Sequence, residues 1–323
     1  MDTFRPDRTV LVPPGEIEHH VTDMSATFSA DLTLAAADEA LAAANQWLPI
    51  DGEREAPLGR LVEENSTGPM RLGFGGWRDL LLGAQFRNGR GDLITAGGRT
   101  VKNVAGYDLT KFMIGQRGAF GRVITLTTRT YLRPAGAVLA RFPLAGNIRN
   151  SIRKFEQLIV TTCRPQWAVL SSDALLCGYL SDERTLNYIE KTLPDHQAAD
   201  IRRLSLEEDI QLRLAARSEA WPASAELHAR VSVPPNHIGD FVEKTRPSAW
   251  HADPAFGIIW ASYAGDSKPV EDAAQLVGGS AVLTRMDGTL VNMTFDPVEK
   301  RLLERLKYAF DPDGKLAPLP MRG

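Results

Sequence analysis

The sequence predicts an α+β protein with two domains, from its length and from the order of its expected elements. The chain has 323 residues, and a domain usually contains about 100–200. Segments with the alternation of strands are interspersed with segments that carry helix signals. The apolar segments within residues 167–180 have no helix-sized connection between them. Because parallel neighbours need a long crossover, we expect a sheet in the second half that is at least partly antiparallel.

The composition excludes several classes of protein. Hydrophobic residues make up 43% of the chain and charged residues 24%, which is ordinary for a soluble protein. The formal charge of −3 gives no general attraction to nucleic acid. No apolar run approaches the roughly 18 residues of a membrane span, and the N-terminus lacks the apolar stretch of a signal peptide. We therefore expect a cytoplasmic protein without a nucleic-acid partner or a transmembrane segment.

The first half is predicted to hold one long helix, a hairpin and a long strand. Residues 31–47 are rich in alanine and leucine and predict a helix that Pro49 ends. Residues 51–79 are rich in glycine and proline, so mainly loop is expected there. The Asn-Gly pair within residues 88–91 predicts a tight hairpin turn. Residues 123–132 alternate and are β-branched, which predicts a strand.

The second half predicts alternating short strands and helices after Pro134, where we place the domain boundary. Ser205 and Glu208 form a capping box that begins a helix extending to about Ala220. Residues 167–180 predict a hairpin that turns at 171–173. Further strands are expected at 137–144, 226–233, 256–265 and 281–286, and further helices at 151–159, 237–245, 269–276 and 298–309. The first domain then spans residues 1–135 and the second 136–323, with its C-terminal tail returning to the first.

A glycine-rich stretch at residues 97–121 is the most unusual part of the chain. Six of its twenty-five residues are glycine, which lets a backbone approach a ligand closely and point N–H groups at an anion. Composition alone leaves two interpretations open: a ligand-binding loop, or a glycine-rich surface loop with a helix that begins near Asp108.

Short motifs in and around this stretch resemble the flavin-binding signature of a known family. They are KNVAGYDL at 102–109, GAFG at 118–121 and LRP at 132–134. Together they resemble the FAD-linked oxidases of the vanillyl-alcohol oxidase (PCMH-type) superfamily, and within it the FAD-binding (E) subunits of bacterial glycolate oxidases. Weaker similarities occur at 56–59, 65–69, 74–83, 230–235 and 310–314.

The resemblance implies a PCMH-type FAD-binding domain, an α+β cap domain and non-covalently bound FAD. The residues that it places along the cofactor are Gly59, Ser66, Thr67, Gly68, Lys102, Asn103, Val104, Ala105, Gly106, Tyr107 and Asp108. It places Gly118, Gly121 and Val123 near the adenine or pyrophosphate end. Lys102 is interpreted either as a cation beside a phosphate or reduced flavin, or as a solvated surface lysine.

The sequence also departs from the family pattern. Residues 8–12 already resemble the strand that follows the family's N-terminal pyrophosphate-binding subdomain, so we expect a truncated FAD-binding domain and weakened or lost FAD binding. Arg60 replaces a usual second glycine, and Arg122 replaces a small or aliphatic residue. At 317–319, Ala-Pro-Leu replaces the family's asparagine-proline-glycine.

Other polar residues give weaker signals. The six histidines and the two cysteines, Cys163 and Cys177, lack metal-ligand spacing, so we expect neither a metal site nor a disulfide framework. His228 and Arg230 lie on one face of a predicted strand and are candidates for orienting a substrate carboxylate. The alternative is that they are ordinary strand residues. Trp260 is interpreted as a core or interface residue, and no catalytic base can be named.

The resemblance implies a function and leaves two alternatives. It implies an FAD-linked oxidoreductase subunit that transfers a hydride from a 2-hydroxy acid such as glycolate to flavin. The electrons would pass to flavoprotein and iron–sulfur partner subunits, through which the complex could associate with a membrane. The first alternative is a non-catalytic accessory subunit that keeps the fold but has lost tight FAD binding. The second is a truncated or mis-started chain.

Overall fold

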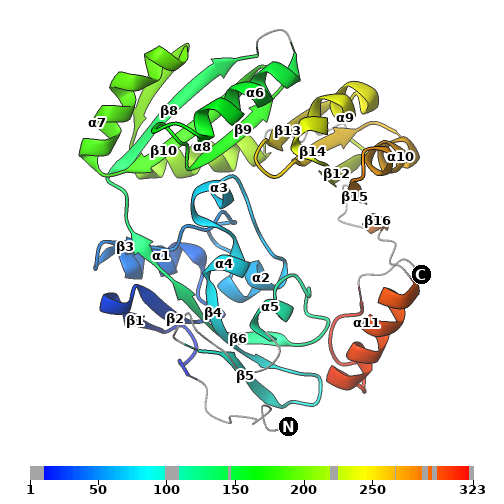
Figure 1. Ribbon diagram of the computed structural model, residues 1–323. Helices are drawn as coiled ribbons and strands as arrows, with labels where there is room; N and C mark the ends of the chain where they lie inside the picture. Colours follow the sequence, from blue (N-terminus) through cyan, green and yellow to red (C-terminus); the bar gives the residue numbers. More distant parts are fainter. Residues whose placement is uncertain are drawn as a thin grey trace. The chain divides into compact units, whose positions relative to one another are not determined.

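The computed structural model describes residues 11–98, 109–144, 147–218, 225–265, 267–285, 290–292 and 297–319, and Figure 1 labels its elements. The chain divides into two units. Unit 1 contains residues 1–68, 75–133 and 295–320. Unit 2 contains residues 69–74, 134–294 and 321–323. Both units combine helices with sheets in which every pairing among the described residues is antiparallel, which confirms the α+β class.

Unit 1 is built on a five-stranded sheet. Its strands, in spatial order, are β1 (Ile17–His20), β2 (Ser25–Ser29), β6 (Arg122–Arg129), β4 (Leu81–Arg87) and β5 (Leu93–Gly97). A small second sheet pairs β3 (Gln46–Trp47) with β7 (Tyr131–Leu132). The helices are α1 (Leu34–Ala42), α2 (Leu58–Glu63), α4 (Trp77–Leu80), α5 (Leu109–Phe112) and α11 (Pro297–Phe310). The apolar side chains of β2, β4, β6, α1 and α2 form one continuous core.

The predicted hairpin at residues 88–91 joins β4 to β5, but its turn works differently from the expectation. The positive φ lies at Gly91 (+89°) rather than at the Asn-Gly pair. Asn88 instead accepts hydrogen bonds through its side-chain oxygen from the amides of Arg90 and Asp92, at 3.0 and 2.9 Å. Asparagine therefore stabilises this turn as a side-chain acceptor.

The segment 51–79 is mainly loop, as its composition indicates, with three short helices. These are α2, α4 and α3 (Arg71–Phe74), which belongs to unit 2. The predicted strand at 123–132 is split into β6 and β7, and the predicted helix at 31–47 is limited to α1. Thr33 caps α1 by accepting a hydrogen bond from the amide of Ala36, which explains where the helix begins.

Unit 2 is built on a nine-stranded antiparallel sheet. Its strands, in spatial order, are β11 (Asp200–Leu204), β8 (Gly136–Pro143), β10 (Ala174–Ser181), β9 (Trp167–Ser171), β13 (Ala249–Asp253), β14 (Ile258–Tyr263), β12 (Leu227–Ser232), β15 (Ser280–Arg285) and β16 (Leu290–Asn292). One face is covered by helices α6 (Ile148–Ile159), α7 (Glu183–Thr192), α9 (Ile238–Thr245) and α10 (Lys268–Leu276), whose buried side chains share the main core of this unit.

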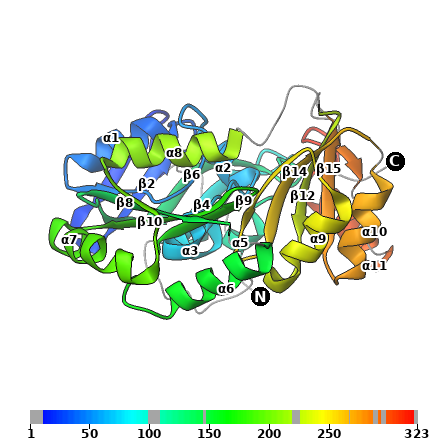
Figure 2. The ribbon, with the colours of Figure 1, turned by 90° about the horizontal axis from the view of Figure 1, so that it is seen from above.

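Helix α8 (Leu206–Ser218) packs on the opposite face of this sheet from α6 (Figure 2). The indole Nε1 of Trp167 on β9 donates to Asp209 on α8 at 2.8 Å, and Arg213 donates to the same carboxylate at 2.9 Å. The predicted capping box is confirmed, because Ser205 and Glu208 exchange backbone and side-chain hydrogen bonds. The sequence therefore located the start of α8 correctly.

Several elements of unit 2 agree with the expectations, and others were not predicted. Strands β8, β12, β14 and β15 and helices α6, α9, α10 and α11 match the expected segments to within a few residues. Helix α7 and strands β11, β13 and β16 have no counterpart among them. Across the described residues, no helix is both long enough and apolar enough to cross a membrane.

Candidate functional site

The most specific part of the predicted flavin site, Lys102, Asn103, Val104, Ala105, Gly106, Tyr107 and Asp108, lies outside the described residues. The other candidates of unit 1 belong to two segments, which we call the 59–68 and 118–123 loops: the first contains most of α2 and the turn after it, and the second a turn and the start of β6. The structure brings these loops together at the end of α2, where the amide of Gly115 donates to the carbonyl of Val62 and that of Arg117 to the carbonyl of Glu63. His228 and Arg230 belong to unit 2.

The glycines of the first loop pack tightly against the chain itself. The amide of Gly59 donates to the carbonyl of Ala30 at 2.8 Å, and a Cβ at this position would lie 2.8 Å from the Cβ of Ala30. A Cβ on Gly68 would lie 2.5 Å from the Cβ of Asp51. Both positions therefore require glycine for internal packing, whether or not a cofactor lies nearby.

Ser66 and Thr67 lie between these glycines. The Ser66 amide donates to the carbonyl of Leu61 at 2.8 Å, and its hydroxyl donates to the carbonyl of Asp51 at 3.1 Å. Ser66 thus uses both of its donors within unit 1. Thr67 is half-buried.

Gln116 holds the second loop in shape. Its side chain donates to the carbonyl of Gly121 at 2.8 Å and accepts from the amide of Phe120 at 2.9 Å. Gly118 has a φ of +76°, which L side chains rarely adopt, so this turn favours glycine there. A Cβ on Gly121 would lie 2.9 Å from the ring of Phe86.

A buried carboxylate joins the two loops. Glu63, at the end of α2, has a side chain that is only 8% exposed. It accepts a hydrogen bond from the Val123 amide at 2.9 Å and pairs with the Arg122 guanidinium at 2.9 Å. Arg122 is 62% exposed and lies against Gly118. The backbone donor of Val123, a predicted cofactor contact, is therefore already used by the chain.

In unit 2, His228 and Arg230 lie on the face of β12 that points away from its core. Leu227, Ala229 and Val231 on the same strand are buried in that core, so the alternation assigns His228 and Arg230 to the other face. Arg230 is exposed and His228 half-buried. Burial lowers the pKa of His228, so its imidazole is neutral at pH 7.

The same face carries two aromatic residues that the sequence did not assign to a site. Trp260 on β14 is directly opposite Arg230, and His251 on β13 is directly opposite Trp260. The rings of His251 and Trp260 stack with centroids 5.1 Å apart and an interplanar angle of 20°. Only the strand register reveals this row. The sequence spacing of residues 230, 251 and 260 gave no signal for it.

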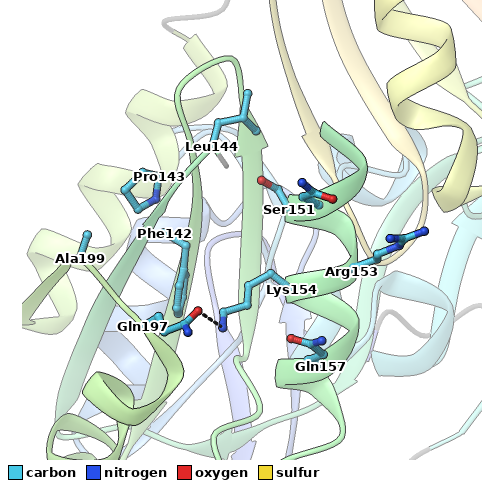
Figure 3. A pocket seen from close by; sticks show the side chains of 10 residues that line it. Phe142, Pro143, Leu144, Ser151, Arg153, Lys154, Gln157, Gln197 and Ala199 are labelled. Carbon is cyan, nitrogen blue, oxygen red and sulfur yellow. Dashed lines mark hydrogen bonds between the residues drawn. The ribbon is translucent and has the colours of Figure 1, made fainter. Parts of the chain in front are cut away.

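A separate hollow of about 590 Å³ opens between the end of β8, α6 and the segment before β11 (Figure 3). Lys154 on α6 lies over the Phe142 ring and contacts Gln197 at 3.4 Å. The hollow contains none of the predicted site residues. No group of three histidine, cysteine, aspartate or glutamate side chains that could hold a metal occurs in the described part of the chain.

Comparison with known proteins shows which of them have sequences similar to this chain. No profile of a known protein family matches it. Over 131 residues it is 33% identical to glycolate oxidase subunit GlcE of Escherichia coli (strain K12), which covers 39% of this chain and 37% of GlcE. It is 25% identical over 344 aligned positions to an uncharacterized FAD-linked oxidoreductase of Mycobacterium tuberculosis, covering 89% of this chain and 73% of that protein. The chain is therefore similar in sequence to FAD-linked oxidoreductases.

The fold is also similar to that of a solved structure. It matches a structure of alkyldihydroxyacetonephosphate synthase with a TM-score of 0.65, over 95% of this chain and 65% of that chain. The sequence identity is 12%, so this likeness concerns the fold alone. The matches span 37% of GlcE and 65% of the synthase chain, so the chain corresponds to only part of each.

The described residues of this chain fit FAD in part. The loops at 59–68 and 118–123 are adjacent, which suits one extended ligand. The amides of Gly59, Ser66 and Val123 already have acceptors within the chain, at 2.8, 2.8 and 2.9 Å. At Val123 the acceptor is a buried carboxylate, so a ligand could use this amide only if Glu63 left it.

Proposed function

We propose that this chain is a subunit of an FAD-linked oxidoreductase that oxidises a 2-hydroxy acid. The observation that carries the proposal is the 33% identity with glycolate oxidase subunit GlcE over 131 residues. A D-lactate dehydrogenase of Arabidopsis thaliana, 27% identical over 121 residues, supports the same class of substrate. Because a relative named as a subunit supports assembly with other chains, we include a heteromeric complex in the proposal.

In this proposal unit 1 holds FAD and unit 2 holds the substrate. The cofactor contacts are those that the resemblance implies at residues 59–68, 102–108 and 118–123. When bound, the flavin supplies the hydride acceptor. The chain's own residues position the substrate and set the charge around it.

Arg230 is proposed to bind the substrate carboxylate. A guanidinium presents paired donors that match the two oxygens of a carboxylate. Trp260 directly opposite it provides an apolar wall, and the neutral His228 lies two residues along the same face. These groups orient a small hydroxy acid. None of them is assigned as the catalytic base.

Anaerobic spectroscopy with added FAD tests this function. Glycolate, D-lactate and D-2-hydroxyglutarate are added in turn to the purified chain, and one of them should bleach the flavin bands. Arg230→Gln should raise KM for that acid by at least about tenfold, the equivalent of one charge-assisted hydrogen bond, with a smaller change in kcat. Arg285→Gln, at another exposed arginine of this sheet, is the control. If bound flavin resists all three acids, the proposed substrate class is wrong.

One observation favours a second candidate function. The Val123 amide donates a hydrogen bond to Glu63. Because this donor is already used, the arrangement favours a chain that keeps the fold without tight FAD binding. An accessory subunit of this kind would assemble with a flavoprotein and contribute no flavin itself. It predicts unchanged spectra on addition of FAD.

A further inference from the structure

We propose that Glu63 closes the nucleotide end of the FAD site, and that FAD binds when the carboxylate releases the Val123 amide. The inference rests on the proposed function, because it takes residues 118–123 as the nucleotide end. It goes beyond that function by naming the side chain that sets cofactor affinity in this chain.

The geometry makes Glu63 a competitor for the site. One carboxylate oxygen accepts from the Val123 amide and the other from Arg122, each at 2.9 Å. The side chain is 8% exposed, so it fills space that is closed to water. A ligand that uses the same amide must displace this oxygen and leave a buried carboxylate with one partner fewer.

The charge of Glu63 also opposes FAD binding. The nucleotide half of FAD carries a negatively charged diphosphate, and the buried Glu63 carboxylate repels it. Arg122 neutralises that carboxylate and, being 62% exposed, also offers a cation to an approaching phosphate. Glu63 and Arg122 therefore have opposite effects on FAD, although they form one ion pair.

The opposite effects of Glu63 and Arg122 on FAD affinity distinguish this proposal from a purely structural role of the ion pair. If the pair served only to hold the loops together, loss of either partner would weaken FAD binding. The proposal instead expects Glu63→Ala to tighten FAD binding by at least about tenfold, the equivalent of one hydrogen bond to a charged group. It expects Arg122→Ala to weaken FAD binding, because Glu63 then loses its countercharge.

Equilibrium titration of the full chain with FAD, followed by flavin fluorescence, is the test. Glu63→Gln keeps an oxygen acceptor for Val123 and removes the charge, so its affinity should lie between those of the wild type and Glu63→Ala. Riboflavin lacks the nucleotide half, so its affinity should be the same in all variants. Glu64→Ala is the matched control, since Glu64 is exposed and pairs with Arg60 at 2.9 Å. Circular dichroism verifies that each variant is folded.

The outcomes distinguish this inference from the proposed function. FAD binding to the wild type with no gain in folded Glu63→Ala overturns the inference and leaves the function standing. FAD binding by Glu63→Ala alone supports the inference and shows that the native chain does not load FAD by itself. If no folded variant binds FAD, both are wrong. Tighter binding by Arg122→Ala contradicts the proposed roles of the charges.

Discussion

At the scale of single residues, the indole of Trp167 occupies the space next to Gly178 that a larger side chain would need. These residues are directly opposite each other on β10 and β9, and a Cβ on Gly178 would lie 1.9 Å from the indole Nε1. That nitrogen donates to Asp209, whose other oxygen binds Arg213 in a pair that is at most 4% exposed. Position 178 must therefore be glycine, because any larger side chain would overlap the indole of Trp167. The sequence alone did not reveal this requirement.

We therefore expect Gly178→Ala to displace the indole and loosen α8. The free energy of unfolding should fall by about 3 kcal/mol, the range of overpacked cores and of broken buried pairs. Urea denaturation measures it. Gly265→Ala is the control, because a Cβ there meets nothing within 4 Å, and its stability should change by less than about 0.5 kcal/mol. Equal stability of both variants would contradict this account of Trp167.

Asp311 makes an acid-sensitive contact in unit 1. Its carboxylate is fully buried and accepts from Lys307 at 2.6 Å and from the amides of Lys315 and Leu316 at 2.8 and 2.9 Å. Burial alone would raise the pKa of Asp311, but Lys307 and the two amides outweigh it and hold the pKa below its usual value. A lowered carboxyl pKa adds stability above the unfolded pKa, and this stability is lost as the pH falls through the folded pKa.

Asp311→Asn should therefore destabilise the chain at pH 7, by an amount on the order of 3 kcal/mol. The difference from the wild type should shrink below about pH 4, near the unfolded pKa of aspartate. Denaturation at pH 7 and at pH 3 tests the change in difference. A difference that stays constant between the two pH values would show that the lost contact is not ionic.

At the scale of elements, α8 and α10 offer a matched pair of helix starts. Ser205 accepts from the amide of Glu208 at 3.2 Å before α8, and the Ser205 amide and hydroxyl hold the pKa of Glu208 below its usual value. Ser267 precedes α10 but makes no side-chain cap. Ser205→Ala should cost about 1 kcal/mol of stability, and Ser267→Ala should cost much less. Thermal unfolding compares them, and equal losses would contradict the cap.

Sequence patterns predicted elements well where one face is apolar and the other polar. Helix α6, for example, buries Ile152 and Phe155 and exposes Arg153. Strand β2 was missed because it is buried on both faces, with the Thr27 and Thr127 hydroxyls bonded to each other at 2.9 Å. Polar residues that find partners in a core imitate a surface pattern, so alternation cannot be recognised there.

The candidate site also has a part that the sequence predicted and a part that it did not. Local motifs predicted the loops at 59–68 and 118–123, because glycine and serine occur there in a recognisable order. The motifs gave no sign of Glu63, which is 59 residues from Arg122 and meets it only in the folded chain. The row from Arg230 through Trp260 to His251 likewise depends on strand register. Contacts between distant segments are what the sequence could not supply.

At the scale of the whole molecule, the chain combines two units with separate cores and resembles only part of its relatives. It covers 37% of GlcE in that alignment, and its own residues satisfy several of the donors expected for a cofactor. We therefore propose that the chain binds FAD and that its own Glu63 carboxylate limits the affinity.

The most direct measurement is the visible difference spectrum of the wild-type chain titrated with FAD at equilibrium. We predict a shift of the flavin bands that saturates at one FAD per chain and is absent after denaturation. A spectrum equal to that of free FAD at every concentration would contradict the claim, and the chain would then be the accessory subunit of a complex whose flavin is bound elsewhere.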